Sequence, residues 1–476
     1  MISFQTTVPL LLGVLASYLV QCAMAWSIGE EEETWQRDMV FGRKLEERSA
    51  GDKFAYASIP FVSGFVGFIT NWLALKMTFY PIYFFGVELL GKYSRVKDQP
   101  VGCIGWQGIV PTKAAKMASM SVKLMTEKLF NIKEIFSRIK VDKAAEKMKA
   151  GFEKSVGGII DTVSDKYVIS QKTEWKRTEA AIKQQMIDWT LAEAPTFTEG
   201  FMSDLIENLD DVFDLEDMCV QEMVANRQLL NDVFEKVGAK ELIFIRNSGF
   251  YFGFLFGLVQ LALWFFFPYG LILPVFGFVV GYLTNFIALK MIFNPINAYH
   301  INLGFTTIKI QGLFLKRQKE ASLMFARQIV GTVLHSKNMW GHMLNGPNKS
   351  EFLALLDKHV DQMTDALVGQ FRPLVMAYLG EDNFDEMKLL VRESARDQIE
   401  AIIDHLHEYT DDALDLENEI DTKMAALPSK DFERVLHPVF EEDEFKLIIV
   451  GAFLGVIVGL FQQFVVFRVD WLGGDL

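Results

Sequence analysis

Five stretches of this chain are apolar over a length that approaches or exceeds the thickness of a bilayer core. They are residues 7–26, 54–80, 249–268, 271–293 and 447–467. Two polar blocks, residues 86–246 and 297–446, lie between them. Charged residues flank the last four runs, which favours membrane-spanning helices over the buried core helices of a large soluble protein. The pattern predicts a multi-pass integral membrane protein.

The first apolar run has two interpretations. Residues 1–26 hold a run of signal-peptide length, and Ala23-Met24-Ala25 resembles a cleavage site. We expect either a signal peptide or a first transmembrane helix here. Both interpretations place the short acidic segment 27–53 on the non-cytoplasmic side of the membrane.

The second and fourth runs end in the same motif, Gly-x-x-Thr-Asn-x-x-Ala-Leu-Lys-Met-x-Phe-x-Pro. The copies at 67–81 and 281–295 share nine identities at a constant offset of 214. An amide inside such a segment is energetically expensive and usually has a partner, whereas a lysine near its end extends its amine to the interface. The candidate residues of the two motifs are Gly67, Thr70, Asn71, Lys76, Gly281, Thr284, Asn285 and Lys290.

The third and fifth runs carry a second duplicated pattern, in which glycines recur at every fourth position before a glutamine. The copies are Gly249, Gly253, Gly257 and Gln260, and Gly451, Gly455, Gly459 and Gln462. Glycines four apart line one helical face and let another backbone approach closely in lipid. We expect each glycine-ladder helix to pack on a motif helix, with Asn71 or Asn285 near Gln260 or Gln462. These four amides should hydrogen-bond to one another, to backbone or to water. The amides then either set the register of the helices or line a polar conduction path.

A third repeated element follows each motif. Gln107-Gly108 and Gln311-Gly312 each precede a basic segment of helix-forming residues, and Gln-Gly suggests a turn before that helix. Residues 54–268 and 269–468 therefore form two tandem units, each with a motif helix, a helical block and a glycine-ladder helix. Residues 469–476 are a tail. Blocks on the same side make these parallel repeats, related by an axis along the membrane normal.

Charge and one short connection predict the topology. Residues 266–271 leave almost nothing between the third and fourth runs, so we expect a tight helical hairpin and both polar blocks on one face. Residues 81–140, just after the first motif, hold ten Lys or Arg against four acids. The positive-inside rule then places both blocks in the cytoplasm, or in the stroma of a plastid.

Both polar blocks show apolar residues at helical spacing, and neither contains a convincing alternating strand. The basic stretch 113–140 fits either core packing or binding along the membrane surface. The expected fold is an all-α integral membrane protein. Four core transmembrane helices come from a tandem repeat, together with the N-terminal signal or fifth helix, and two amphipathic helical blocks lie on one side.

The second block is strongly acidic. Residues 349–446 contain 25 acids and 10 bases, against a net charge of −14 for the whole chain. Such a surface disfavours nucleic acid as a partner. It fits either a solvated helical face or a docking site for a basic partner or for cations.

Known catalytic patterns are absent from the sequence. It has no Gly-x-Ser-x-Gly elbow, Walker loop, Gly-x-Gly-x-x-Gly after a strand, or His-Glu-x-x-His. Its three cysteines are too few and too scattered for a disulfide framework or a zinc site. We therefore expect no enzymatic activity, cofactor or metal.

The doubled motif followed by Gln-Gly resembles the membrane family described as domain of unknown function 445, which includes YheB- and YjiN-like proteins. The stretch from Phe432 through Asp443-Glu444 to the Gly451 ladder resembles that family's C-terminal end. The resemblance covers nearly all of the chain from Phe54, as two units in tandem. It implies a membrane location and a helical build, without a settled activity or catalytic residues.

Three functions remain open from the sequence. The first is a non-catalytic protein that organises the membrane, tethers or acts as a scaffold, with the bilayer, and protein partners or lipids at the helical blocks, as its partners. The second is a transporter or channel with a polar path formed by Asn71, Asn285, Gln260 and Gln462 at the repeat interface. The third is a lipid-handling protein that uses the apolar stripes as a groove. The sequence does not indicate an oligomeric state.

Overall fold

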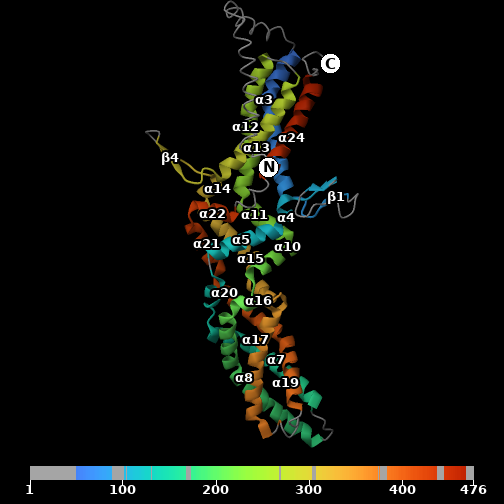
Figure 1. Ribbon diagram of the computed structural model, residues 1–476, viewed down its shortest axis with the longest axis vertical. Helices are drawn as coiled ribbons and strands as arrows, with labels where there is room; N and C mark the ends of the chain where they lie inside the picture. Colours follow the sequence, from blue (N-terminus) through green and yellow to red (C-terminus); the bar gives the residue numbers. More distant parts are fainter. Residues whose placement is uncertain are drawn as a thin grey trace, which may run out of the picture.

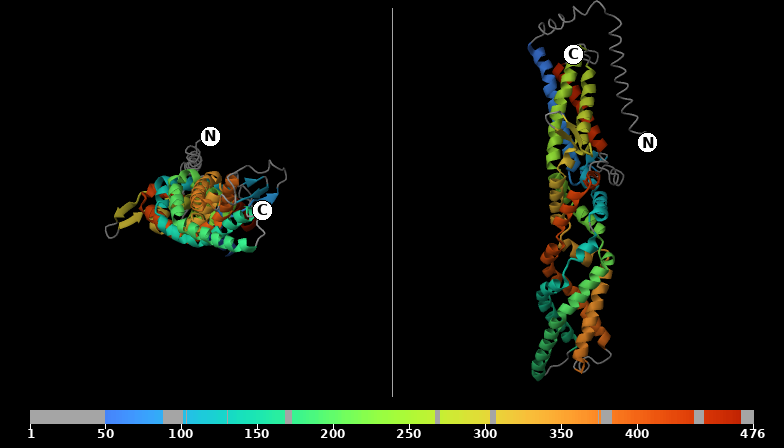
Figure 2. Two further views of the ribbon diagram at one scale, coloured as in Figure 1. Left: turned by 90° about the horizontal axis from the view of Figure 1, so that it is seen from below. Right: turned by 90° about the vertical axis from the view of Figure 1, so that its left-hand side faces the viewer.

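The computed structural model is an elongated rod made mostly of helices (Figures 1 and 2). An apolar helical bundle forms one end, and a long polar stalk continues from it. The expectations for residues 1–26, for nearly all of 27–53 and for the 469–476 tail lie outside the described residues. The structure describes residues 50–87, 101–102, 104–129, 131–167, 173–266, 270–302, 307–373, 375, 383–436 and 444–467.

Four helices of the bundle are long and apolar enough to cross a membrane. The first motif helix packs on the first glycine-ladder helix, and the second motif helix packs on the second ladder helix. Both blocks leave the bundle from the same end, where the stalk begins (Figure 1). The helices are α3 (Ala50–Phe79), α12 (Ala239–Phe266), α13 (Ile272–Phe293) and α24 (Glu444–Phe461), the last continued by a π-helical segment at Gln462–Phe467.

One expected boundary is wrong by about three turns. Helix α12 begins at Ala239, ten residues before the expected start at 249. Lys240, Glu241 and Arg246 lie in these first turns and interrupt the apolar run, so hydropathy alone places the start too late. The helix is continuous and carries the bundle into the stalk.

Short β-hairpins follow both motif helices, although the sequence showed no strand. In the first sheet, β3 (Ile104–Trp106) pairs antiparallel with both β1 (Phe85–Val87) and β2 (Val101–Gly102). In the second, β4 (Tyr299–Asn302) pairs with β5 (Thr307–Ile310). Strands of two to four residues are too short to show alternation, which is why sequence periodicity misses them. The two sheets project to opposite sides at the base of the bundle (Figure 1).

The proximal stalk, the part next to the apolar bundle, interleaves the two sequence units. In each unit a four-residue helix is followed by a fifteen-residue helix, α4–α5 in the first and α14–α15 in the second. Within each unit α5 packs on α10 and α15 on α21, whereas α11 reaches α15 and α22 reaches α5 of the other unit. The helices are α4 (Ile109–Thr112), α5 (Ala114–Lys128), α10 (Leu215–Ala225), α11 (Arg227–Val237), α14 (Leu313–Lys316), α15 (Gln318–Thr332), α21 (Leu416–Ala426) and α22 (Ser429–Leu436).

The far end of the stalk is a four-helix bundle with two helices from each block. Helix α7 contacts α8 and α19, and α17 contacts the same two helices, so the four form a ring. Its helices are α7 (Val141–Tyr167), α8 (Thr173–Glu207), α17 (Lys349–Gln370) and α19 (Phe384–Ile403). Shorter elements connect it to the proximal stalk: α6 (Ile132–Phe136), α9 (Leu209–Val212), α16 (Ser336–Asn345), η3 (Asp404–Leu406) and α20 (His407–Leu414).

A single hydrophobic core joins these parts. It includes Phe79 and Ile448 in the apolar helices of the bundle as well as Phe201 and Ile399 in the distal stalk. The apolar stripe of α5, including Met117, is buried in this core, so of the two interpretations of 113–140 the structure supports core packing over the membrane surface for this helix. Units 54–268 and 269–468 are successive in the chain, but they do not form separate bodies.

Candidate functional site

The first motif helix and the first glycine ladder meet backbone to backbone. A Cβ atom added at Gly67 would overlap the carbonyl oxygen of Gly249 on α12. One added at Gly253 would overlap the carbonyl of Ser63, and one at Gly257 would lie 2.7 Å from Pro60 Cα. No larger side chain fits at these positions while the helices keep this separation.

The second pair of helices repeats this contact. A Cβ atom at Gly281 would overlap the carbonyl oxygen of Gly451, and one at Gly455 would overlap that of Gly277. A Cβ at Gly459 would overlap the carbonyl oxygen of Leu273. The glycines predicted to allow close approach therefore lie at the closest approach of each pair.

The asparagines of the motifs hydrogen-bond to the backbone of the neighbouring ladder helix. Asn71 Nδ2 donates to the carbonyl oxygen of Ile245 at 2.6 Å. Asn285 Nδ2 donates to that of Leu447 at 3.0 Å. Each acceptor lies four residues before the first glycine of its ladder. Both asparagine side chains therefore bond to backbone, one of the three kinds of partner expected for them.

The expected meeting of asparagine and glutamine is therefore wrong. Gln260 Oε1 accepts a hydrogen bond from Ser63 Oγ at 2.8 Å, two turns along α3 from Asn71. Eleven residues separate Gln260 from the Gly249 contact, which is about 16 Å along a helix. Gln462, the counterpart of Gln260, is buried at the start of the π-helical segment that continues α24.

The remaining motif residues have local roles. Thr70 Oγ1 donates to the carbonyl of Gly67 at 3.1 Å, and Thr284 Oγ1 donates to that of Gly281 at 3.4 Å. Lys76 and Lys290 are exposed near the stalk ends of their helices, and the Lys76 amine lies 4.8 Å from the ring centroid of Tyr80. Their positions agree with amines that extend to an interface.

The Gln-Gly turn packs against the end of the motif helix, a contact that the sequence did not indicate. In each unit the glycine amide donates to the carbonyl of the motif proline, and the glutamine amide donates to the carbonyl of the next residue. The four distances are 2.8 Å for Gly108 N to Pro81 O, 2.7 Å for Gln107 Nε2 to Ile82 O, 3.0 Å for Gly312 N to Pro295 O and 3.2 Å for Gln311 Nε2 to Ile296 O. The peptide bond preceding each proline is cis. A Cβ at Gly108 would lie 2.7 Å from the carbonyl carbon of Phe79, so this position requires glycine.

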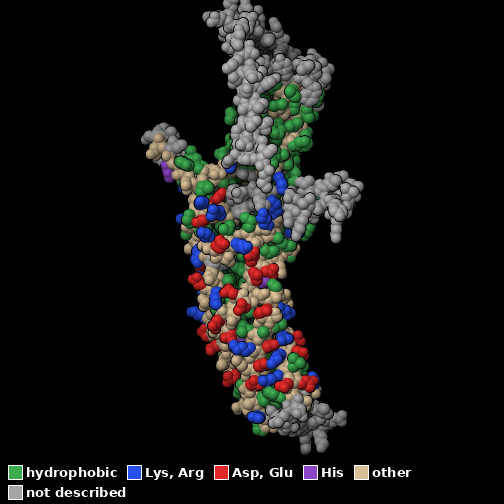
Figure 3. All heavy atoms as spheres, in the orientation of Figure 1, with side chains coloured by type: hydrophobic (Ala, Val, Ile, Leu, Met, Phe, Trp, Pro, Cys, Tyr) green, Lys and Arg blue, Asp and Glu red, His purple; other side chains and the backbone are tan. Residues whose placement is uncertain are grey.

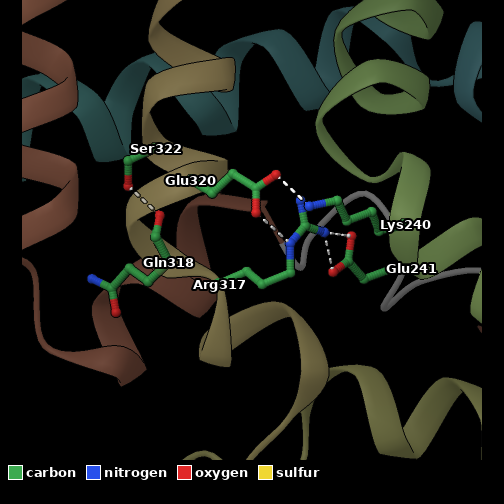
Figure 4. Close-up of polar contacts among 6 residues, drawn as sticks. All are labelled: Lys240, Glu241, Arg317, Gln318, Glu320 and Ser322. Atoms are coloured by element: carbon green, nitrogen blue, oxygen red, sulfur yellow. Dashed lines mark hydrogen bonds and ion pairs between the residues drawn. The ribbon is translucent and has the colours of Figure 1, made fainter.

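A charged cluster at the top of the stalk joins the two units (Figure 4). Arg317, at the corner between α14 and α15, donates from Nη1 to both carboxylate oxygens of Glu241, at 2.6 and 2.8 Å. Its Nε donates to Glu320 at 2.9 Å, and Lys240 Nζ donates to the other oxygen of Glu320 at 2.6 Å. The Glu241 side chain is 5% exposed and that of Arg317 is 18% exposed. Sequence reasoning missed this cluster because its members lie in segments more than 70 residues apart.

Neighbouring polar contacts attach the same corner to α21. Gln318 Nε2 donates to the carbonyl oxygens of Met424 at 3.0 Å and Leu427 at 2.8 Å, at the end of α21. Ser322 Oγ donates to the carbonyl of Gln318 at 2.8 Å (Figure 4). The corner thus supplies donors to a helix C-terminus that would otherwise have unpaired carbonyls.

Hydrogen bonds from Arg317 and then from Lys240 lower the pKa of Glu320 to about 2. Burial acts to lower the pKa of Arg317, but hydrogen bonds to Glu320 and Glu241 outweigh it and raise that pKa. Glu320 and Arg317 are therefore both charged at neutral pH.

An apolar cavity of about 150 Å³, partly open to solvent, lies between α7, α8, α17 and α19. Of its 21 lining residues only Ser155, Thr190 and Thr364 are polar. The two threonine hydroxyls donate to carbonyls of their own helices, at 2.8 and 2.7 Å.

Chemically reactive groups are few in the described part of the chain. No cluster of His, Cys, Asp and Glu there could hold a metal ion. Cys219 is buried as a free thiol, and its burial raises the pKa of that thiol. A protonated, inaccessible thiol is a poor nucleophile.

A scan against protein-family models, a search of curated proteins and a search of solved structures each return no match. The resemblance to domain of unknown function 445 stays a prediction based on the motifs.

Replacing Gly281 by alanine is expected to destabilise the bundle by about 1–3 kcal/mol, because the added methyl forces α13 away from α24. The measurement is thermal unfolding of the full chain in detergent, followed by circular dichroism. Gly331→Ala on α15 is the control, since nothing lies within 4 Å of its Cβ position. That change should be neutral or stabilising by up to about 1 kcal/mol. Equal melting of the two variants would contradict the contact described here.

Replacing Glu241 by glutamine is expected to cost about 2 kcal/mol, because the half-buried Arg317 guanidinium loses a charged hydrogen-bond acceptor. The free energy of unfolding is compared with that of Glu417→Gln. Glu417 pairs with Arg327 at 3.2 Å on the surface, so its loss should cost less than about 1 kcal/mol. If Glu241→Gln lowered the free energy of unfolding less than Glu417→Gln does, the cluster would not stabilise the junction between the two units.

The Glu320 pair should give a defined acid dependence. Since the folded-state pKa is lowered from 4.5 to about 2, the stabilisation is complete above pH 4.5 and is lost as pH falls towards 2. Wild-type chain should therefore be more stable than Glu320→Gln at pH 7. The difference should shrink below pH 4.5 and vanish near pH 2 in parallel denaturant titrations. A difference that is constant over this range would count against the assignment.

Proposed function

We propose that the protein is a non-catalytic integral membrane protein that acts as a scaffold or tether. Four spanning helices anchor it, and its stalk presents a surface for partners at a distance from the bilayer. The observation that carries this proposal is the hydrophobic core shared by the bundle and both polar blocks. A shared core holds the stalk in one orientation relative to the spanning helices, as a tether requires.

The outer face of the bundle supports membrane insertion. Phe61 and Phe65 on α3, Tyr251 on α12 and Phe453 on α24 are each more than half exposed. Large exposed apolar patches mark contact with another apolar phase. Figure 3 shows that hydrophobic side chains dominate the visible part of the bundle, whereas the stalk surface mixes both charges. A surrounding lipid phase accounts for this contrast.

The two hairpins support a position for the bilayer interface. Tyr83 and Phe85 beside the first sheet and Tyr299 in the second are 65–80% exposed at the base of the bundle. Aromatic side chains gather at the headgroup level of membranes. The two hairpins, on opposite sides of the bundle, would then contact the same headgroup layer. The stalk would lie on the cytoplasmic or stromal side, as the positive-inside rule predicts.

The contacts give less support to a transporter or channel. Asn71 and Asn285 donate to carbonyls of adjacent helices, and Gln260 accepts from Ser63. Asn71 Oδ1 and Gln260 Nε2 are buried without a partner among the described residues. Asn71 and Ser63, the partner of Gln260, are eight residues apart on α3, about 12 Å by the helix rise. Two separated amide atoms do not make a continuous polar path.

Photo-crosslinking from the intact membrane tests the tether. A photo-reactive amino acid replaces Leu389, an exposed residue of the distal stalk, or Phe61, an exposed residue of the bundle. Position 389 should repeatedly give one or a few soluble proteins, and position 61 should give lipid. Lipid or no product at position 389 would contradict a tethering role for the stalk.

A second experiment separates the scaffold from the transporter. Replacing Asn71 and Asn285 together by leucine removes two interhelical hydrogen bonds, each worth about 1 kcal/mol in membranes. We expect normal insertion and an unchanged set of crosslinked partners. Loss of a solute flux in vesicles, with insertion intact, would favour the transporter.

A further inference from the structure

We infer that the cavity between α7, α8, α17 and α19 is a binding site for a single apolar chain, such as the acyl chain of a lipid. This site goes beyond the scaffold function and does not depend on it. Three observations define the ligand: the length of the cavity, the chemistry of its lining and the kind of contact that closes one of its walls.

The cavity is elongated along the bundle. Its lining follows α7 from Phe152 to Val163, about 16 Å at the rise of an α-helix, and α17 from Leu356 to Val368, about 18 Å. Spread over this length, a volume of about 150 Å³ leaves room for one slender chain. A helix, with a diameter of about 10–12 Å including its side chains, is too wide. The space therefore fits a lipid chain and excludes a partner helix.

The lining selects for an apolar ligand. Eighteen of the 21 lining residues are apolar, and the hydroxyls of Thr190 and Thr364 are already used within their own helices. A polar ligand would lose hydrogen bonds to water without replacement. Met186, Met363 and Met387 also line the cavity. Their flexible side chains adapt to chains of different length or unsaturation.

An ion-pair ladder closes the wall between α17 and α19. Its rungs recur at every fourth residue of each helix, in antiparallel order: Asp357–Arg396, Asp361–Arg392 and Asp365–Lys388. Surface ion pairs of this kind are individually weak and are screened by salt. Thr364 on α17 and Ala395 on α19, which line the cavity, are direct sequence neighbours of the rungs Asp365 and Arg396. The seam is the wall that can part to admit a chain while the other contacts persist.

The position of the cavity bears on the source of the chain. It lies at the end of the stalk opposite the spanning helices (Figure 1). A lipid that stays in the bilayer of the protein itself does not reach it. The chain comes either from a free fatty acid or from a phospholipid taken up from solution or from a facing membrane.

Native mass spectrometry of the full chain, released from detergent, tests the site with palmitate and separately with a phosphatidylcholine as probes. Val391→Trp fills the cavity from α19. Leu389→Trp, two residues away on the exposed face of the same helix, is the matched control. Wild-type chain and the control should retain one adduct, and Val391→Trp should lose at least tenfold in occupancy. The probe that is retained identifies the source, and either one supports the site.

A milder filling variant guards against misfolding. Ala395→Leu adds volume to the same cavity, and circular dichroism checks the helix content of every variant. Palmitate or phosphatidylcholine should raise the melting temperature of wild-type chain but not that of Ala395→Leu. Equal adducts in wild-type chain and both filling variants would overturn the proposal, because they would locate the lipid on the spanning helices. Failure of wild-type chain to retain either probe would overturn it as well.

Discussion

The architecture depends on the contact of bare backbone between two pairs of helices. Gly67 against Gly249, and Gly281 against Gly451, bring carbonyl oxygens to positions that any Cβ would occupy. At that separation Asn71 and Asn285 reach the carbonyls of Ile245 and Leu447. In the proposed lipid environment, dispersion between closely packed surfaces supplies the attraction, because burying apolar surface adds little there. The amides select the register of each pair.

The stalk continues away from the bundle through contacts between helices of the two sequence units. The Gln-Gly turns attach the start of each block to the end of its motif helix. The bidentate contact between Arg317 and Glu241 then joins α14–α15 of the second unit to α12 of the first. Neither unit can change its orientation without breaking contacts made by the other. A rod built in this way transmits position over its length, which a tether or scaffold needs.

The features predictable from the sequence were those set by local spacing. The glycine ladders and the small residues around Asn71 and Asn285 indicated which helices would pack closely. The start of α12 was missed because charges interrupt its apolar run, and the hairpins were missed because their strands are too short for periodicity. The apolar stripes containing Val360 and Val391 were visible, but a stripe cannot show whether the space between four helices is filled.

The sequence by itself determined where the four apolar helices of the described part of the chain lie, their close-packed faces and the absence of known catalytic motifs. These properties follow from the identity and spacing of residues within single helices. The tertiary structure alone decided that the asparagines bond to backbone and that Arg317 meets Glu241. It also decided that the distal helices leave an apolar cavity between them. Each of these depends on distances between segments remote in the chain, and those distances are set only when all the helices pack together.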